Sequence, residues 1–184
     1  IRAAFDAADK LSILFVGDTM IDRWVHGRIL PCQDDCPKFV QEDMVETPGG
    51  AANAEQCLGH WNVRTVLYGF GANDCPVKTR YVNNDGQIVY RADNDGPRTR
   101  GAGYGWVRDL ALEMTLHADG VLISDYDKGV LTPEFIRRLI DLCCKIGCPC
   151  VADCKREPDL YRGAILKGNR DWYAHYSGDV IGET

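Results

Sequence analysis

Short continuous apolar runs recur along the chain, each bounded by glycine or polar residues. Runs of this kind are typical of strands that are covered on both faces, which is the usual situation in a parallel sheet. They occupy residues 13–17, 63–70, 120–124, 150–154 and 163–167. The pattern predicts an α/β protein.

Segments with helical spacing lie between these runs. An alanine-rich stretch follows Gly50, and apolar residues recur at helical spacing over residues 106–114. The clearest helix starts after Thr132, which can cap it with a proline in the first turn, and ends at Gly147. A short helix is expected over residues 171–176.

Two segments do not follow the α/β pattern. Residues 22–45 are interrupted by prolines and acidic pairs, which favours a peripheral β excursion. Residues 77–92 hold two alternating runs around the sequence NNDG at residues 83–86. Because Asx and Gly residues tolerate the positive φ of a hairpin turn, we expect a β-hairpin there.

Composition narrows the class of protein. The 184 residues suit one domain, and 27 acidic against 21 basic residues give a net charge of -6, which argues against nucleic-acid binding. Without an apolar run of about 20 residues or a secretory start, we expect no membrane contact and a cytoplasmic location.

The nine cysteines match no common zinc template. We interpret them as reduced thiols, with a metal site or a disulfide as the alternative. Cys143, Cys148 and Cys150 fall where a helix and a strand would be buried, and a free cysteine behaves there as a small apolar residue.

Carboxylates follow three of the predicted strands, at Asp18, Asp125 and Asp153. Open α/β sheets bind ligands at the carboxyl ends of their strands. Carboxylates at that edge accept hydrogen bonds from sugar hydroxyls or hold a hydrated Mg²⁺, while the alternative is helix capping or loop solvation. The recurrence at three strands favours a site for a polar ligand.

Small residues and lysines accompany these carboxylates. Gly49, Gly50 and Asn53 stand at a helix start, where backbone amides and the helix dipole favour an anionic or hydroxyl-rich ligand; a tight turn is the alternative. Lys128 and Lys155 each lie near a strand-end carboxylate, which suits phosphate neutralisation or a surface ion pair.

Five segments, taken in order, resemble the ribokinase-like (PfkB-type) carbohydrate kinase family, and most closely its members that phosphorylate a heptose phosphate on the way to ADP-heptose. They are ILFVGDTMIDRWVHGRI, ETPGGAANAEQCLGHWNVRTVLYGFGAND, VKTRYVNNDGQIVYRADND, VLISDYDKGVLT and CVADCKREPDLYRGAILKGN. The resemblance implies a doubly wound, mostly parallel sheet flanked by helices, with a small β lid formed by residues 22–45 and 77–92. It also implies ATP and Mg²⁺, a sugar or sugar-phosphate substrate, and a homodimer through the lid.

The resemblance also assigns roles to individual residues. The positions that match sugar-binding residues of the family are Asp18, Asp22, Gly49, Gly50 and Asn53. Lys78 and Arg80 lie on the lid hairpin facing the substrate, and we group Asp125 with them. The positions on the phosphate and nucleotide side are Lys128, Asp153, Lys155 and Asn169.

The sequence departs from the family pattern in three places. The segment that carries the glycine-rich loop and the catalytic-base aspartate in the family is absent, so no catalytic residue is assigned. Trp172 stands where the family has a glutamate, and a helix and a strand that relatives insert after Asp74 are missing. Because phosphoryl transfer depends on positioning and charge stabilisation, we expect this chain alone, a fragment or a reduced homologue, to be a poor kinase.

Two other functions stay open. A non-catalytic module that binds a sugar or dimerises through the lid fits the same departures. A dinucleotide-dependent oxidoreductase rests only on the glycines of residues 101–105, which no predicted strand precedes.

Overall fold

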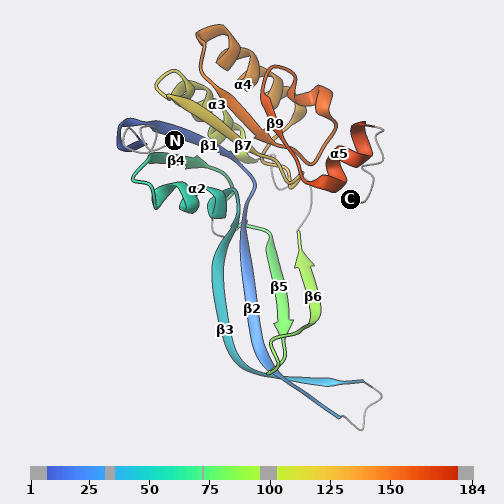
Figure 1. The fold of residues 1–184 in the computed structure, drawn as a ribbon. Helices are drawn as coiled ribbons and strands as arrows, with labels where there is room; N and C mark the ends of the chain where they lie inside the picture. The colour runs from blue at the N-terminus through green and yellow to red at the C-terminus, as the bar shows by residue number, and fades with distance from the viewer. Residues whose placement is uncertain (1–7, 32–35, 72, 96–102, 178–184) are drawn as a thin grey trace.

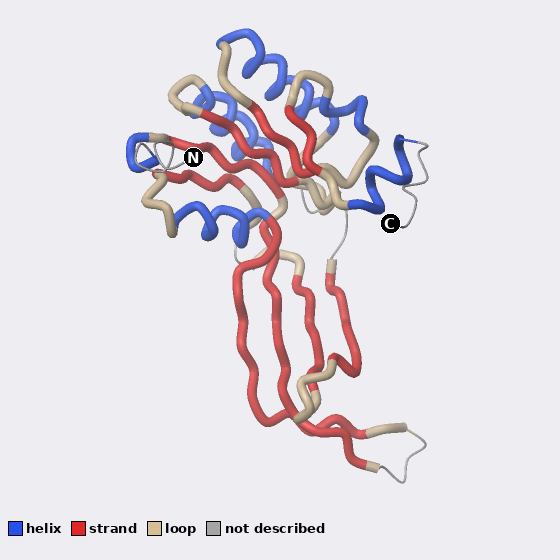
Figure 2. Tube along the Cα trace, in the orientation of Figure 1, coloured by secondary structure: helices blue, strands red, loops and turns tan. Residues whose placement is uncertain are grey.

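The computed structural model describes residues 8–31, 36–71, 73–95 and 103–177, and these form two sheets (Figure 1). A parallel sheet with its helices forms the larger part, which we call the body. A second sheet, which we call the small sheet, extends away from it. Figure 2 shows the helices gathered around the body sheet.

The boundaries of the body elements follow the predicted pattern closely. The body strands are β1 (Ser12–Gly17), β4 (Arg64–Tyr68), β7 (Gly120–Ser124), β8 (Cys150–Asp153) and β9 (Ile165–Lys167). The body helices are α2 (Ala51–Gly59), α3 (Gly105–Thr115), α4 (Pro133–Ile146) and α5 (Arg170–Ser177), with short 3₁₀ helices η1 (Ala8–Lys10) and η3 (Pro158–Tyr161). The small sheet contains β2 (Thr19–Leu30), β3 (Lys38–Gly50), β5 (Val77–Val82) and β6 (Ile88–Asn94).

The body sheet is parallel throughout, with the strand order β4-β1-β7-β8-β9. The chain passes from β1 outward to β4 and then crosses back to β7, so the order reverses between β1 and β7. Helix α2 lies on one face, while α3 and α4 contact each other on the other face (Figure 1). The predicted α/β fold is confirmed, and its ligand is expected at the carboxyl ends of β1 and β7, where the order reverses.

Helix α4 illustrates how the sequence builds the body core. The hydroxyl oxygen of Thr132 accepts a hydrogen bond of 3.2 Å from the amide of Phe135, and Gly147 ends the helix with a φ of 73°. Ile136, Leu139 and Ile140 are buried against the sheet. Each such side chain contributes about 1.5 to 3 kcal/mol when fully buried, so this face anchors the helix.

The small sheet is centred on β2, which pairs antiparallel with β3 and parallel with β5. The predicted hairpin is confirmed as β5 and β6. Its turn is held by Asn83, whose side-chain oxygen accepts hydrogen bonds from the amides of Asp85 at 3.1 Å and Gln87 at 2.9 Å. The β2 and β3 strands are longer than the predicted segment of residues 22–45, because only Asp18 separates β1 from β2.

The cysteines within the described ranges are free thiols. Cys143 and Cys150 are buried as predicted, whereas Cys148 is only partly buried because it lies in the loop that leaves α4. Within the same ranges, every helix is too short or too polar to cross a bilayer.

Candidate functional site

Asp18 follows β1 and is fully buried. Its carboxylate accepts hydrogen bonds from the amides of Tyr126 at 2.9 Å, Lys128 at 3.0 Å and Val130 at 3.2 Å. Burial raises its pKa most, the amide of Lys128 opposes that shift, and the nearby Asp125 adds to it. Asp18 therefore holds the loop after β7 in place, with both oxygens engaged.

Asp125 follows β7 and is also fully buried. The guanidinium of Arg156 donates two hydrogen bonds to its Oδ2, that from Nε at 2.8 Å, and the Tyr161 hydroxyl donates another at 2.6 Å. The amide of Asp127 donates to Oδ1 at 2.8 Å. Burial, and then the charge of Asp125, raises the pKa of Tyr161. The charge of Asp125 is thus balanced inside the protein.

Asp153 is the last residue of β8, and one of its oxygens has no hydrogen-bond partner among the described residues. Lys167 donates to its Oδ2 at 2.7 Å, and its Oδ1 is buried without a hydrogen bond within the described ranges. Backbone hydrogen bonds join the three strand ends, from the Asp18 amide to the Ser124 carbonyl at 3.0 Å and from the Asp125 amide to the Asp153 carbonyl at 3.1 Å. The three predicted carboxylates therefore meet at one edge of the sheet.

One face of the small sheet gathers charged residues from three of its strands. In the strand register, Asp22 stands opposite Lys78, and Trp24 stands opposite Arg80. Because side chains alternate between faces, these residues share one face with two others from β6. The six residues of this charged face are Asp22, Trp24, Lys78, Arg80, Arg91 and Asp93.

Ion pairs order the charged face. Arg80 donates to Asp22 at 2.6 Å, and its guanidinium lies 4.8 Å from the centre of a Trp24 ring. Arg91 makes a two-pronged contact with Asp93, at 2.8 and 2.7 Å. The predicted lid residues Asp22, Lys78 and Arg80 are thus brought together.

Tyr126 is the point where the charged face meets the body. The ammonium of Lys78 lies 5.2 Å from the centre of its ring, and the ammonium of Lys155 lies 5.3 Å from it. Lys128 pairs with Asp95, just beyond β6, at 2.6 Å. Within the described ranges, neither Lys78 nor Lys155 is paired with a carboxylate.

The electrostatic surroundings of Lys78 are positive. Burial, and then the charges of Arg91 and Lys128, lower its pKa, and Asp22 and Asp93 compensate for only part of this effect. Such an ammonium favours an incoming anion, because the anion replaces lost solvation and offsets the neighbouring cations.

The predicted glycines shape the junction of β3 and α2. Gly50 has a φ of 57°, and a Cβ atom there would lie 2.3 Å from the carbonyl oxygen of Asp18. A Cβ atom on Gly49 would lie 2.6 Å from a carboxylate oxygen of Asp22. Both positions therefore allow close approach, and Asn53 lies exposed in the first turn of α2.

The residues predicted on the nucleotide side are more dispersed. Lys155 is exposed, and the side-chain oxygen of Asn169 accepts a hydrogen bond of 2.8 Å from the amide of Trp172, so Asn169 caps α5. The Trp172 indole donates to the carbonyl of Arg156 at 2.9 Å and packs on Gly168. Trp172 thus acts as a buried support where the family pattern has a glutamate.

The described residues contain no cluster of three His, Cys, Asp or Glu side chains arranged to hold a metal ion. Asp18 and Asp125 are engaged by internal donors, and Lys167 holds one oxygen of Asp153. The carboxylates therefore do not fit a protein-built magnesium site, and we assign no Mg²⁺ ligand.

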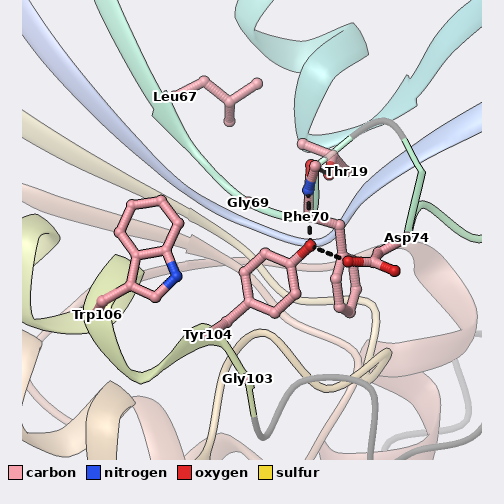
Figure 3. A pocket seen from close by; sticks show the side chains of 9 residues that line it. Thr19, Leu67, Gly69, Phe70, Asp74, Gly103, Tyr104 and Trp106 are labelled. Atoms are coloured by element: carbon pink, nitrogen blue, oxygen red, sulfur yellow. Dashed lines mark hydrogen bonds between the residues drawn. The ribbon is translucent and has the colours of Figure 1, made fainter.

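A cavity of about 520 Å³ lies at the end of β4, beside the acidic edge (Figure 3). The Tyr104 hydroxyl donates to Asp74 at 2.7 Å and accepts from the amide of Gly71 at 2.9 Å, next to Phe70 and the largely exposed Trp106. Sequence reasoning missed this cavity, as it missed Tyr126, Arg156 and Tyr161. The cavity and Tyr126 are marked in the sequence only by aromatic and glycine residues near strand ends, which are common in any α/β protein, and no pattern marks Arg156 or Tyr161.

A doubly wound sheet with a second sheet rising from its switch point defines a ribokinase-like fold, and solved structures agree. The superposition with an Arabidopsis thaliana ribokinase complexed with ribose and ATP covers 91% of this chain and 63% of the ribokinase chain, with a TM-score of 0.60 and 17% sequence identity. The tetrameric inhibited form of phosphofructokinase-2 from Escherichia coli matches 94% and 66%, with a TM-score of 0.58 and 14% identity. At these identities the likeness establishes the fold.

By sequence, the chain is a homologue of the proteins named bifunctional protein HldE. The Caulobacter vibrioides protein is 30% identical over 201 aligned residues, which cover 92% of this chain and 41% of the relative. The Geobacter metallireducens protein is 29% identical, with 98% and 43% covered. The chain thus spans about two fifths of the length of these relatives, and no family model matches it. The predicted resemblance to ribokinase-like carbohydrate kinases is confirmed.

Proposed function

We propose that the chain forms the sugar-phosphate side of a ribokinase-like carbohydrate kinase located in the cytoplasm. The proposed reaction transfers the terminal phosphoryl group of ATP to a hydroxyl group of a heptose-phosphate-like substrate in ADP-heptose synthesis. The homology to HldE proteins and the ribokinase-like fold support this assignment. The observation that carries it is the charged face of the small sheet, which meets the carboxyl edge of the body at Tyr126.

Asp22 is the residue best suited to bind sugar hydroxyls. Its side chain is 26% exposed, and Arg80 holds only its Oδ1. Its Oδ2 occupies the space over Gly49 that a side chain would fill, since a Cβ atom there would lie 2.6 Å from this oxygen. A carboxylate in this position accepts hydrogen bonds from neighbouring hydroxyl groups, and the bond from Arg80 keeps it oriented.

Lys78 is the residue best suited to bind the phosphate of the substrate. Its ammonium has no carboxylate partner within the described ranges, and Arg91 and Lys128 add positive charge around it. Lys155 lies on the same tyrosine ring from the body side. An anionic sugar is therefore attracted more strongly than a neutral one.

We include ATP and Mg²⁺ in the proposal because the chain resembles ATP-dependent carbohydrate kinases. Lys128, Asp153, Lys155 and Asn169 are the proposed residues on the nucleotide side. Mg²⁺ that accompanies a nucleotide is bound largely by phosphate oxygens and water. We assign no catalytic base among the described residues and derive no catalytic step through the metal ion.

A thermal-shift titration tests the sugar-phosphate site. Heptose 7-phosphate is expected to raise the melting temperature more than the unphosphorylated heptose does. Asp22→Asn is expected to remove both shifts, whereas Lys78→Ala removes only the part that depends on the phosphate. Equal shifts for the two sugars, or none, would contradict the proposed site.

The kinase reaction has a separate test. With ATP, Mg²⁺ and heptose 7-phosphate, a coupled assay of ADP release measures turnover. ADP release that depends on the sugar supports a kinase. Sugar binding without ADP release supports the second candidate, a non-catalytic binding or dimerisation module.

Apolar exposure on the small sheet favours that second candidate. A cavity of about 420 Å³ near its far end is lined by apolar and aromatic side chains, and Tyr90 in this region is 64% exposed. Phe39 packs edge-on against Tyr81 at 5.2 Å. In sedimentation experiments we expect a homodimer, and we expect Tyr90→Asp to weaken it. A monomer at every concentration would contradict a dimer through this sheet.

A further inference from the structure

Two cysteines meet where α4 ends, at the opposite end of β8 from the site described above. Gly147 has a φ of 73°, and the amide of Cys148 donates to the carbonyl of Cys143 at 2.9 Å. The amide of Gly147 donates to the carbonyl of Cys144 at 3.4 Å. These two hydrogen bonds define a Schellman motif, which frequently brings the side chains of its first and sixth residues together. Here both of those residues are cysteines.

The backbone bond limits the distance between the two cysteines. The covalent bonds on either side of the hydrogen bond add about 4 Å at most, so the Cα atoms of Cys143 and Cys148 lie no more than about 7 Å apart. Disulfides span Cα separations up to about this value. The helix cap therefore holds the pair at bonding range without any movement of distant parts of the chain.

The neighbouring thiols also affect one another's acidity. Hydrogen bonds from the Cys150 and Cys148 thiols lower the pKa of Cys143, against the effect of its burial. The hydrogen bond to Cys143, and then burial, raises the pKa of Cys150. Cys143 is thus the thiol of this group that most readily becomes a nucleophilic thiolate.

Access from solvent distinguishes the three thiols. Cys143 and Cys150 are buried, whereas Cys148 is partly exposed. Among the described residues, the Cys148 thiol also lies near two weak acceptors, the carbonyls of Ala118 at 3.5 Å and Pro149 at 3.8 Å. Burial, and then the charge of Cys143, raise the pKa of the Cys148 thiol, so its thiolate forms at alkaline pH. A small oxidant nevertheless meets Cys148 first, because Cys143 is buried.

We propose that Cys143 and Cys148 form a disulfide-forming pair that responds to small-molecule disulfides. The Cys148 thiolate attacks a disulfide RSSR, forming a mixed disulfide and releasing one thiol. The Cys143 thiolate then attacks the sulfur of Cys148, forming the protein disulfide and releasing the second thiol. Two protein thiols are oxidised, one RSSR is reduced to two RSH, and the cysteine protons pass to the leaving thiolates.

The described geometry favours this pairing over the alternatives. Cys150 is buried on β8 with a raised pKa, so it stays a thiol while Cys143 reacts. Cys144 points elsewhere, with its sulfur 3.7 Å from the carbonyl of Gly163. These thiols also belong to no metal-binding cluster within the described ranges.

Mass spectrometry of the native 184-residue chain tests the pair. The reduced protein is incubated with oxidised glutathione at pH 8, alkylated and digested with trypsin. Cleavage after Lys145 separates the two cysteines, so the disulfide joins the peptides of residues 139–145 and 146–155. We expect this linked pair, with fragmentation that assigns the bond to Cys143 and Cys148.

Variants make the assignment decisive. Cys148→Ser is expected to abolish the linked peptides, whereas the matched control Cys144→Ser, at the exposed neighbouring cysteine, is expected to retain them. A linked pair that persists in Cys148→Ser would overturn the proposal. Glutathione that remains on Cys148 without a linked pair would overturn it as well.

Discussion

Replacing Asp125 by asparagine separates a structural carboxylate from a ligand-binding one. Asparagine has nearly the same shape as aspartate but carries no charge. Both oxygens of Asp125 accept hydrogen bonds, so the NH₂ group of asparagine would face a donor. Arg156 and Tyr161 would then lose the charged acceptor that they share, and Arg156 would become a cation without its principal anionic partner. Asp127 offers a matched control two residues away, because its carboxylate lies 3.8 Å from the same guanidinium but its side chain is 40% exposed.

The two substitutions differ in expected magnitude. Removing one partner of a buried ion pair costs about 3 to 5 kcal/mol. Because the Arg156 side chain keeps 15% exposure, we expect the lower end, about 3 kcal/mol for Asp125→Asn. The exposed contact of Asp127 is worth about 0.5 kcal/mol. With a urea m-value of about 2 kcal/mol/M, the midpoint of Asp125→Asn falls by about 1.5 M.

Urea unfolding followed by tryptophan fluorescence measures both midpoints under identical conditions. The reasoning predicts a large shift for Asp125→Asn and a small one for Asp127→Asn. Equal shifts for the two variants would refute the structural role of Asp125. In that case the carboxylate would be available to a ligand, as the family resemblance implied.

Three further predictions concern the site and its supports. Only protonated Lys78 attracts an anion, and its pKa is lowered, so sugar-phosphate affinity is expected to decrease with rising pH before the usual pKa of lysine is reached. In calorimetry, Lys78→Arg is expected to extend binding to higher pH, and identical pH profiles for the two proteins would contradict this. Gly50→Ala is expected to lower the free energy of unfolding by about 2 kcal/mol or more, because φ is positive and the carbonyl of Asp18 is too close, while Gly59→Ala, which faces open space, does not destabilise. Trp172→Ala is expected to cost about 3 to 5 kcal/mol in the same urea assay, and a change below 1 kcal/mol would show that this buried indole is not a support.

Local patterns predicted most of the body and the hairpin of the small sheet. The apolar runs became parallel strands, Thr132 caps α4, and the NNDG turn joins β5 to β6. These features depend on residues that are neighbours in the sequence, through hydrogen bonds within a turn or the burial of one continuous segment. These features can therefore be predicted from the order of the residues.

The sequence by itself also determined that carboxylates follow three of the strands, but only the tertiary structure decided that these strands are neighbours and which groups the carboxylates bind. Asp18 is satisfied by amides more than a hundred residues away, and Asp125 by Arg156 and Tyr161. Likewise, the ammonium groups of Lys78, from the small sheet, and Lys155, from the body, lie over the ring of Tyr126. A polar group is either hydrogen-bonded within the protein or left available to a ligand, depending on which distant segments the strand order brings next to it. Residue types and their spacing do not encode that proximity.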